Sequence, residues 1–549
     1  YMNSNSQEIK MIPTRLDYLG EMNEGILSLK IHQIYKNTSF YSNCKAVLVL
    51  PQTLTQSITG LECILNGQKV DLVVGESQLA KETADIAEKH GYSTIRSENS
   101  SDEQMLKIFL GQLPINSECD ITLEMEIISS NSGTNTLQTV IPFSNQDIDP
   151  QNFNFSIQYN EIIKISSINI FESNNQHKIN YSFDGKILKI NKKPLNSIVL
   201  MTELKEQIPN VIINDNDSQY SILQIYPKFS NTLINSDYIF IVDCSGSMSG
   251  SPIKNASECL SVFMHSLPIG CRFNIILFGS YCKCIFDQNH LVEYNKMNLH
   301  IADRAIKDLR ADMGGTNLYD PLFCAYNQSK NTREKGRIVQ IFLLTDGMID
   351  NKESVFKLAR MNRTNNRIFS LGIGNEVDND LVSGLATLSN GKFDFIQSSS
   401  MITNKVISLL SLSLSPTLTN VSVHSPNDDL LEIVPNPLTP IYDQIMMSIY
   451  IKRSNKDKYL NNIMITGNIG SQQVEILVDK YANISTTSAK KLFAFNAIND
   501  YQNIYNDGAL SYSELEKIKN KVIQLSIENK ILSMFTSFVG FKENPQIFN

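Results

Sequence analysis

The chain lacks a long apolar run, and it has only seven histidines. No uncharged apolar stretch approaches the roughly 20 residues that a membrane-spanning helix needs, so we expect no transmembrane segment. No histidine lies in a recognisable nucleophile constellation, and no Walker-type phosphate loop is present, which together predict a protein that is not an enzyme. A net charge of −8 and a pI near 5.5 argue against general binding to nucleic acid or acidic membranes.

The nine cysteines are odd in number and follow no repeating spacing. Cys244 and Cys324 fall in segments that we expect to be buried, where a free thiol acts as a small apolar group. Cys282-Lys-Cys284 has no matching Cys or His pair nearby, and its alternation predicts a strand rather than a metal or redox site. Reduced cysteines favour an intracellular, cytoplasmic location.

The length of 549 residues is too great for one hydrophobic core and suggests three or four domains. Short apolar runs over 24–140 predict an antiparallel β-sandwich, interrupted by one helix from Glu76 to Gly91. Strands continue over 150–230 and return over 417–480. Between them, strands and helices alternate from 237 to about 415, which is typical of a doubly wound parallel sheet. Within the predicted helix, the apolar residues are close to helical spacing: Leu79, Ala80, Ala84 and Ala87.

Three separated pieces of this α/β segment carry oxygen ligands. The buried strand 238–242 leads into Asp243, Ser245 and Ser247, and Thr316 follows two glycines, Gly314 and Gly315. A second apolar strand ends in Asp346. Two carboxylates and three hydroxyls at the strand tips make an oxygen-only cage, which suits Mg²⁺, Ca²⁺ or Mn²⁺ and would suit zinc poorly. Asp350 either supports this shell from outside or is merely solvated, and we favour the second interpretation.

These pieces closely resemble the metal-ion-dependent adhesion site of a von Willebrand factor A (vWA) domain. The resemblance implies that Ser245, Ser247 and Thr316 bind the ion directly, while Asp243 and Asp346 supply charge directly or through water. It also implies a protein partner that completes the shell with an Asp or Glu carboxylate. We expect the ion to be Mg²⁺ in the cell, because the ligand set is all oxygen and Mg²⁺ is abundant there. Gly246, Gly314 and Gly315 are expected to let the backbone approach closely.

A second resemblance covers the N-terminal part. It looks like a VIT domain, the module shared by inter-α-trypsin inhibitor heavy chains and their intracellular relatives. The segments that carry it are Tyr35-Lys-Asn37, Pro51, the Ala-rich helix, Phe109 to Pro114, and Cys119 to Ile127.

On this basis we divide the chain into five regions: a VIT domain over 1–145, a β-rich connection over 146–235, a vWA domain over 236–416, a further β-rich region over 417–485 and a C-terminal helical segment with a final strand over 486–549. We expect the two β-rich regions to pair with each other or with the VIT domain, so that the vWA domain is an insertion with its ends close together. In the last region, Ser513 and Glu516 predict a capping box. The helix that follows has one face formed by Leu515, Ile518, Val522 and Leu525.

The leading functional hypothesis is a non-enzymatic interaction protein that docks a partner carboxylate through the divalent ion. One alternative is a structural subunit of a large intracellular assembly whose metal site does not regulate binding. Loss of the partner on chelation would separate these two hypotheses. Another alternative is a secreted matrix-binding chain like the inter-α-trypsin inhibitor heavy chains. Those chains depend on a C-terminal processing site, which we do not find near Asn544 to Asn549.

Overall fold

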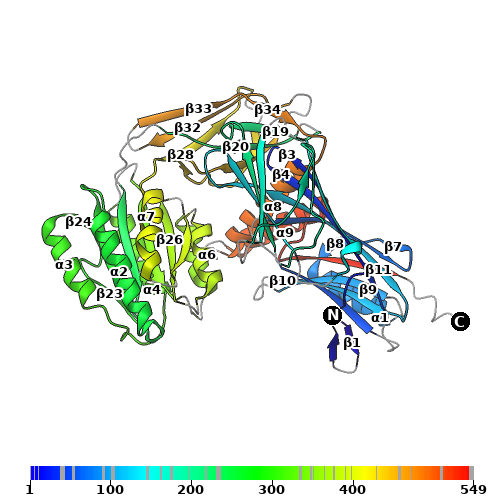
Figure 1. The fold of residues 1–549 in the computed structure, drawn as a ribbon, viewed down its shortest axis with the longest axis horizontal. Helices are drawn as coiled ribbons and strands as arrows, with labels where there is room; N and C mark the ends of the chain where they lie inside the picture. The colour runs from blue at the N-terminus through cyan, green and yellow to red at the C-terminus, as the bar shows by residue number, and fades with distance from the viewer. Residues whose placement is uncertain are drawn as a thin grey trace.

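The computed structural model describes most of the chain. The described residues are 2–4, 7–9, 11–37, 44–51, 56–89, 93–100, 105–143, 148–160, 164–172, 177–195, 197–216, 219–229, 236–332, 337–346, 349, 352–363, 365–374, 377–389, 391–396, 399–427, 430–454, 459–469, 472–506 and 511–542. An α/β unit lies at one end of the molecule and a β-rich framework forms the remainder (Figure 1). The predicted fold class, an α/β unit flanked by antiparallel β-sandwich regions, is confirmed.

The α/β unit is a parallel sheet with helices on both faces. Its strands are β21 (Asp237–Asp243), β22 (Arg272–Phe278), β25 (Val339–Thr345), β26 (Asn366–Ile373) and β27 (Phe393–Ile396), with the antiparallel β23 (Cys282–Cys284) and β24 (Val292–Glu293) beside β22. Every residue of β21, β25 and β26 is buried, because helices cover both faces of a parallel sheet. One face packs on α2 (Ser251–Ser266), α3 (Lys296–Lys307) and α7 (Ile402–Ser413). The other packs on α4 (Tyr319–Asn331), α5 (Lys352–Met361) and α6 (Asn379–Leu388).

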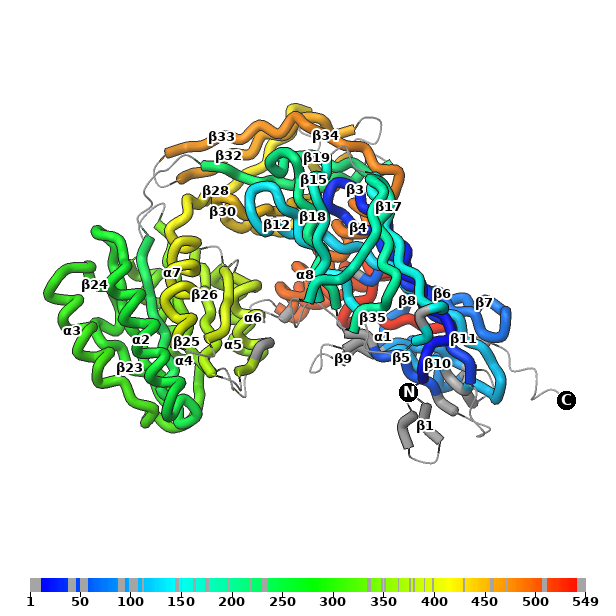
Figure 2. Tube along the Cα trace, in the orientation of Figure 1, coloured from blue at the N-terminus to red at the C-terminus, as the bar shows by residue number. Residues whose placement is uncertain are grey.

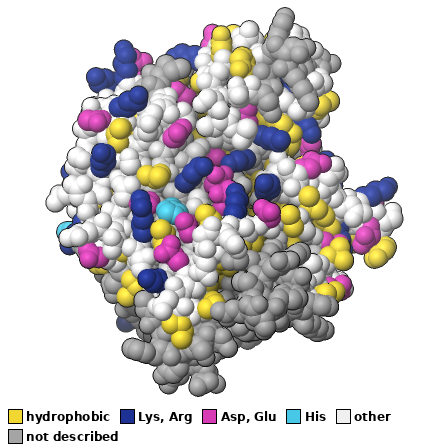
Figure 3. Space-filling model, turned by 90° about the vertical axis from the view of Figure 1, so that its right-hand side faces the viewer, with side chains coloured by type: hydrophobic (Ala, Val, Ile, Leu, Met, Phe, Trp, Pro, Cys, Tyr) yellow, Lys and Arg dark blue, Asp and Glu magenta, His cyan; other side chains and the backbone are white. Residues whose placement is uncertain are grey.

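The N-terminal region is a β-sandwich around one apolar core. One sheet follows the order β16 (Ser182–Phe183), β17 (Ile187–Lys189), β14 (Phe153–Tyr159), β3 (Arg15–Asn23), β4 (Ile26–Lys36), β11 (Glu118–Ile128), β6 (Gln56–Leu65) and β7 (Gln68–Val70). The other follows β2 (Gln7–Ile9), β1 (Met2–Ser4), β5 (Cys44–Pro51), β10 (Met105–Leu113), β9 (Ser93–Ser100), β35 (Thr536–Lys542) and β8 (Val73–Glu76). On the face seen in Figure 3, basic and acidic side chains are interspersed over the described surface.

The helix predicted within the sandwich is present as α1 (Ser77–Lys89). Ala80 and Ala84 are buried, and both pack with Val539 of the C-terminal strand. Leu79 is 59% exposed, so it does not share the buried face that Ala80 and Ala84 form. Two small alanines allow the helix to lie close to β35, and the larger Leu79 projects outside this contact. The side chain of Ala87 lies outside the described residues.

The C-terminal strand β35 completes the N-terminal sheet. It lies between β8 and β9 and is antiparallel to both, with Phe538 opposite Val74 and Val539 opposite Arg96 (Figure 2). Phe538 is 2% exposed and belongs to the sandwich core. The sequence analysis expected a final strand but did not place it in this sheet.

Strands on either side of the α/β unit share a sheet. β20 (Tyr220–Ile225) lies between β19 (Val211–Asn214) and β31 (Met447–Arg453), in the order β29 (Leu430–Val434), β31, β20, β19 and β34 (Tyr481–Asn483). A second sheet has the order β30 (Ile441–Tyr442), β28 (Thr417–His424), β32 (Ile463–Ile469) and β33 (Gln472–Val478), and it shares a core with the first. A third comprises β12 (Ser130–Asn131), β13 (Thr136–Ile141), β18 (Ile198–Leu204) and β15 (Ile165–Glu172).

Hydrogen bonds join the chain just before the α/β unit to the chain just after it. The backbone N–H of Gln444 donates to the carbonyl of Pro227 (2.9 Å), and that of Asp443 donates to the carbonyl of Pro416 (2.9 Å). The Asp443 carboxylate accepts from the N–H of Phe229 (2.7 Å). The α/β unit therefore leaves and rejoins the framework at one place.

Two C-terminal helices, α8 (Ser488–Asn506) and α9 (Tyr512–Asn529), pack on each other and on the framework. The capping box of α9 is formed by Ser511 and Glu514, not by the predicted Ser513 and Glu516, because the helix begins at Tyr512. Val522 is fully buried, and Ile518 and Leu525 are partly buried in the same cluster. Among the described residues, no helix combines the length and apolar character needed to cross a membrane.

Candidate metal centre

Asp243 is the last residue of β21, and it is fully buried because this strand lies between β22 and β25. Both of its carboxylate oxygens accept hydrogen bonds. Oδ1 accepts from the backbone N–H of Ser245 (2.9 Å), and Oδ2 accepts from the hydroxyl of Thr345 (2.6 Å). The Ser245 hydroxyl lies 3.0 Å from the hydroxyl of Ser247, within the turn that opens the short helix Gly246–Met248. The first predicted piece therefore places one carboxylate and two hydroxyls together.

The loop that carries Thr316 lies directly against this turn. The N–H of Met313 donates to the carbonyl of Cys244 (3.0 Å), and the N–H of Gly246 donates to the carbonyl of Gly314 (2.8 Å). Thr316 is half-buried in this loop. The second predicted piece is thus held beside the first by backbone hydrogen bonds.

Ser280 fixes the glycine loop and was missed by the sequence analysis. Its hydroxyl accepts from the N–H of Gly315 (2.7 Å), and its own N–H donates to the carbonyl of Met313 (2.7 Å). Gly314 has a φ of 82°, and a Cβ there would lie 2.6 Å from the Ser280 hydroxyl. A Cβ on Gly246 would meet its nearest atom at 3.7 Å, which is ordinary contact. The expected close approach therefore occurs at Gly314 rather than at Gly246.

Asp346 follows β25, the strand next to β21. Its side chain is nearly buried, at 8% exposure, and its Oδ1 has no hydrogen-bond partner among the described residues. Its backbone carbonyl accepts from the N–H of Asp378 (3.0 Å), which holds the loop in place. An unpaired buried carboxylate oxygen is costly in a protein interior unless a cation or donor meets it. Asp350 lies outside the described residues.

The electrostatics of the site favour a cation. Burial raises the pKa of Asp243, and the negative charge of Asp346 raises that pKa further. Hydrogen bonds from Ser245 and Thr345 act in the opposite direction without cancelling the effect. Two buried carboxylates whose negative charges repel each other form a site that a divalent ion would stabilise.

The donor set fits a hard divalent cation. Asp243, Ser245, Ser247, Thr316 and Asp346 offer only oxygen atoms, which is the chemistry that Mg²⁺, Ca²⁺ and Mn²⁺ prefer. Over the part of the chain that the structure describes, no cluster of three or more His, Cys, Asp or Glu side chains could hold a metal. The candidate centre has only two such side chains, and its remaining donors are hydroxyls. Thr345 and Ser280 are not proposed ligands, but their hydrogen bonds hold Asp243 and the glycine loop in place. The position of Thr345 immediately before Asp346 is the one sequence signal that could have identified Thr345.

Two family models match parts of the chain. Residues 236–395 match the model of the von Willebrand factor type A domain, and residues 13–125 match that of the Vault protein inter-alpha-trypsin domain. Two von Willebrand factor A domain-containing proteins of Dictyostelium discoideum are 26% and 28% identical to this chain, over 99% and 97% of its length. The chain spans 60% and 64% of the length of these two relatives. Von Willebrand factor A domain-containing protein 5B1 of Mus musculus is 33% identical over 41% of this chain and 19% of its own length.

Solved structures also show similarity to parts of the chain. A von Willebrand factor type A protein from Catenulispora acidiphila aligns with a TM-score of 0.40 and 15% identity, covering 58% of this chain and 84% of that one. Proximal thread matrix protein 1 from the mussel byssus aligns with a TM-score of 0.29 and 17% identity, covering 34% of this chain and 50% of that one. That structure is described as having a zinc-occupied MIDAS (metal-ion-dependent adhesion site) motif. With both family models matched in sequence, the chain contains a Vault protein inter-alpha-trypsin domain followed by a von Willebrand factor type A domain.

Proposed function

We propose that this chain is a non-enzymatic interaction protein that binds the Asp or Glu carboxylate of a partner protein through a divalent cation. The proposed ligands are Asp243, Ser245, Ser247, Thr316 and Asp346, and the proposed ion is Mg²⁺. The observation that carries the proposal is Asp346 Oδ1, a buried carboxylate oxygen without a partner among the described residues, beside Asp243 at the same sheet edge.

The residue types explain why such a site would bind a partner. Serine and threonine hydroxyls are neutral ligands, so they hold a cation without cancelling its charge. Thr345 and the Ser245 N–H already occupy both oxygens of Asp243, which fits a carboxylate that supplies charge and orients the site. When bound, the ion would offer a coordination position that a partner carboxylate can fill.

Free thiols support an intracellular setting for this function. All eight cysteines whose side chains the structure describes are free, although the sulfurs of Cys63 and Cys119 are only 3.8 Å apart. Reduced cysteines of this kind are typical of proteins in reducing compartments.

Metal titration of the full chain tests the ligand assignment. Mg²⁺, Ca²⁺, Mn²⁺ and Zn²⁺ would each be titrated into the wild-type protein and into Asp346→Ala, with heat of binding as the readout. Asp312→Ala is the matched control, because Asp312 is an exposed carboxylate in the loop that carries Thr316. We expect Asp346→Ala to lose binding and Asp312→Ala to keep it. Equal metal affinity in wild type and Asp346→Ala would contradict the assignment.

Partner capture tests the role of the ion. The tagged full chain would be used to purify partners from the native source, with and without a chelator, and with Thr316→Ala in parallel. We expect chelation and Thr316→Ala to release the same partner, since the substitution disturbs the ligand set without changing net charge. Retention of that partner under both conditions would favour a structural subunit whose metal site does not control binding.

A further inference from the structure

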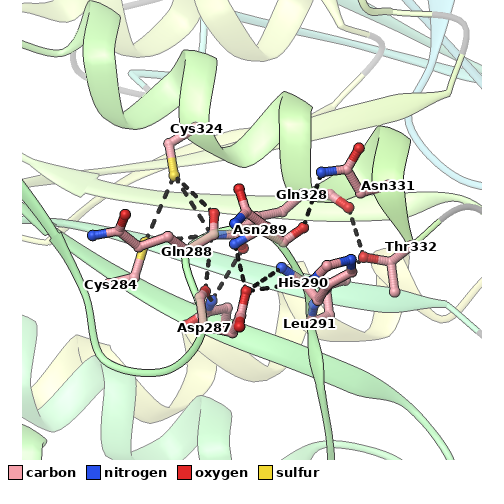
Figure 4. A network of polar contacts seen from close by, with 11 residues as sticks. Cys284, Asp287, Gln288, Asn289, His290, Leu291, Cys324, Gln328, Asn331 and Thr332 are labelled. Carbon is pink, nitrogen blue, oxygen red and sulfur yellow. Dashed lines mark hydrogen bonds and ion pairs between the residues drawn. The ribbon is translucent and has the colours of Figure 1, made fainter.

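Two cysteine sulfurs from different elements meet at the edge of the α/β unit. Cys284 lies on the edge strand β23 and Cys324 on helix α4, 40 residues apart in sequence, with their Sγ atoms 3.6 Å apart (Figure 4). Both side chains are half-buried rather than enclosed. The strand expected for Cys282 to Cys284 is present, but Cys324 does not act only as a buried apolar group, because it faces a second thiol.

A buried amide is aimed at both sulfurs. Gln328 lies one turn after Cys324 on α4 and is fully buried. Its Nε2 lies 3.3 Å from the sulfur of Cys284, 3.5 Å from that of Cys324 and 3.1 Å from the carbonyl oxygen of Gln288, so its two hydrogens are shared among these acceptors. Its Oε1 accepts from Nδ2 of Asn274, which is also fully buried, at 3.1 Å. This last bond assigns the amide orientation and points the N–H groups at the thiols.

The amide pair is tied to the neighbouring loop as well. Asn274 Nδ2 donates to the carbonyl of Asp287 (2.7 Å), and Gln328 Nε2 donates to the carbonyl of Gln288 (3.1 Å). Two amides in an otherwise apolar sheet–helix contact are costly unless their hydrogen bonds are made. Here Asn274 holds Gln328 so that its N–H groups lie beside the two sulfur atoms. An apolar side chain at this position would fill the space but would offer the sulfurs no donor.

The two thiols differ in acidity. The hydrogen bond with Cys284 lowers the pKa of Cys324 to about 7, and the amide of Gln328 acts in the same direction against the effect of burial. The corresponding interaction raises the pKa of Cys284. A thiol with a lowered pKa beside a neutral thiol is the arrangement in which one sulfur attacks an oxidant and the other resolves the product.

We propose that Cys284 and Cys324 form a peroxide-sensitive dithiol that closes to a disulfide. The Cys324 thiolate attacks hydrogen peroxide, so that an S–O bond forms, the O–O bond breaks and hydroxide leaves, taking up a proton to give water. The Cys284 thiol then attacks the sulfur of the Cys324 sulfenic acid, so that the S–S bond forms, the S–O bond breaks and a second water leaves. Two thiols are oxidised and one peroxide is reduced.

Closure would require the sulfurs to approach from 3.6 Å to about 2.05 Å. It would link β23 to α4, and α4 begins at Tyr319, shortly after Thr316. The enclosed segment contains the glycine loop Gly314 to Thr316, so oxidation would restrain the chain on both sides of that loop. The chemistry of the dithiol does not depend on metal binding.

Peptide mapping of the full chain tests the pairing. The reduced protein would be treated with a small excess of hydrogen peroxide, blocked with an alkylating reagent and digested without reductant. We expect a Cys284–Cys324 cross-linked peptide. The internal control is Cys63 and Cys119, whose sulfurs are 3.8 Å apart but whose side chains are fully buried, and which should remain as thiols. Recovery of Cys284 and Cys324 as free thiols, or a Cys282–Cys324 link, would overturn the proposal.

Variants distinguish the attacking sulfur from the resolving one. Cys284→Ser should leave Cys324 as a sulfenic acid that a dimedone probe labels, whereas Cys324→Ser should abolish labelling at Cys284. Cys282→Ser should keep the cross-link, and it serves as the control for loss of a neighbouring thiol. Labelling of Cys284 in the Cys324→Ser variant at the rate of Cys324 would contradict the assigned roles.

The pH profile of alkylation tests Gln328. Gln328→Leu retains the size of the side chain but removes both donors, so the apparent pKa of Cys324 in the rate of alkylation should rise. A role for Gln328 in packing alone would leave that pKa unchanged, and such a result would remove the amide from the proposal. Circular dichroism of each variant checks that the fold is retained.

Discussion

Thr345 shows how one hydroxyl orients a buried carboxylate. It donates to Asp243 Oδ2 at 2.6 Å, and it is itself fully buried beside the sheet edge. Without this donor, one oxygen of Asp243 would lose its partner inside the protein, where an unmet hydrogen bond costs about 1–3 kcal/mol. Thr345 is therefore a positioning residue for the candidate metal centre.

Replacing Thr345 with Val tests this role, because Val has nearly the same shape and no hydroxyl. We expect Mg²⁺ affinity to fall about tenfold, the lower end of the usual effect of removing a group that orients a ligand. Titration calorimetry of the full chain measures it. Thr387→Val is the control, since the hydroxyl of Thr387 is exposed and donates only to its own helix. Unchanged affinity in Thr345→Val would show that Asp243 does not need this donor.

His32 gives the N-terminal sandwich a dependence on pH. It lies on β4 between Asp17 of β3 and Asp120 of β11, with ring nitrogens 3.1 Å and 2.7 Å from their carboxylates. Burial lowers the pKa of His32, but the hydrogen bonds and charges of Asp120 and Asp17 outweigh it and raise that pKa overall. A raised folded-state pKa means that the stabilisation is complete below the unfolded value, about 6.5, and is lost as the pH rises through the folded value.

His32→Gln should therefore lower the free energy of unfolding more at pH 5.5 than at pH 8.5. We expect a difference of about 0.5–1 kcal/mol between the two conditions, because the ring is 26% exposed and solvent screens the pair. Chemical denaturation at the two pH values measures it. His300→Gln, at an exposed position on α3, should show no such difference. A larger loss at pH 8.5 would reverse the sign that we derive.

At the scale of elements, β35 connects the end of the chain to its beginning. Its backbone fills the space between β8 and β9, and Phe538 enters the sandwich core while Val539 meets α1. Without this strand, β8 and β9 would present unpaired edges and α1 would lose its apolar contact. The N-terminal sheet is therefore complete only when the C-terminal segment has folded onto it.

Phe538→Ala should destabilise the sandwich by about 3–5 kcal/mol, the usual cost of removing a buried phenylalanine ring. Hydrogen exchange of the amides of β8 and β9 in the full chain measures it locally. Leu477→Ala is the control, because Leu477 is 56% exposed on β33 and should change stability by no more than about 0.5 kcal/mol. Undiminished protection of β8 in Phe538→Ala would show that this sheet does not depend on β35.

At the scale of the whole molecule, the α/β unit is attached to the β framework at one place. Pro227, Asp443, Gln444 and Pro416 are linked there by backbone hydrogen bonds. Further contacts lie nearby: the Arg367 guanidinium is 3.8 Å from the ring of Tyr442, and Arg363 lies 3.6 Å from Asp500 of α8. Because the entry and exit segments meet, the framework strands pair without needing the inserted unit between them.

Replacing 236–416 with a short Gly-Ser linker should therefore leave the framework folded. We expect the amides of β20 and β31 to keep their protection from hydrogen exchange, while the isolated 236–416 segment should unfold cooperatively on its own. As the control, the same linker would be inserted within strand β20, between residues 222 and 223. This insertion should disrupt the pairing of β20 with β31. Loss of protection in β20 and β31 on removal of the inserted unit would show that the framework depends on it.

Local pattern was sufficient to predict the alternating strands and helices of the α/β unit and the sheet edge at which the candidate ligands lie. The run 238–242 and the run ending at Thr345 are apolar because parallel strands are covered on both faces, so the residues that follow them were expected at one sheet edge. The structure places Asp243, Ser245 and Ser247 beside Gly314, and it places Asp346 directly after the adjacent strand β25. Their role as metal ligands stays a prediction that the titrations above address.

Only the tertiary structure decided which distant residues meet. The insertion of β35 beside β8, the contact of Cys324 with Cys284 and the support that Ser280 gives to Gly315 each join positions far apart in the chain. No periodic pattern in the sequence predicts these contacts, because a strand edge, a thiol or a hydroxyl can pair with any suitable group that the fold brings near. The shift of the capping box from Ser513 to Ser511 has a different cause: two serines lie at the start of the helix, and the backbone geometry makes the first of them the N-cap.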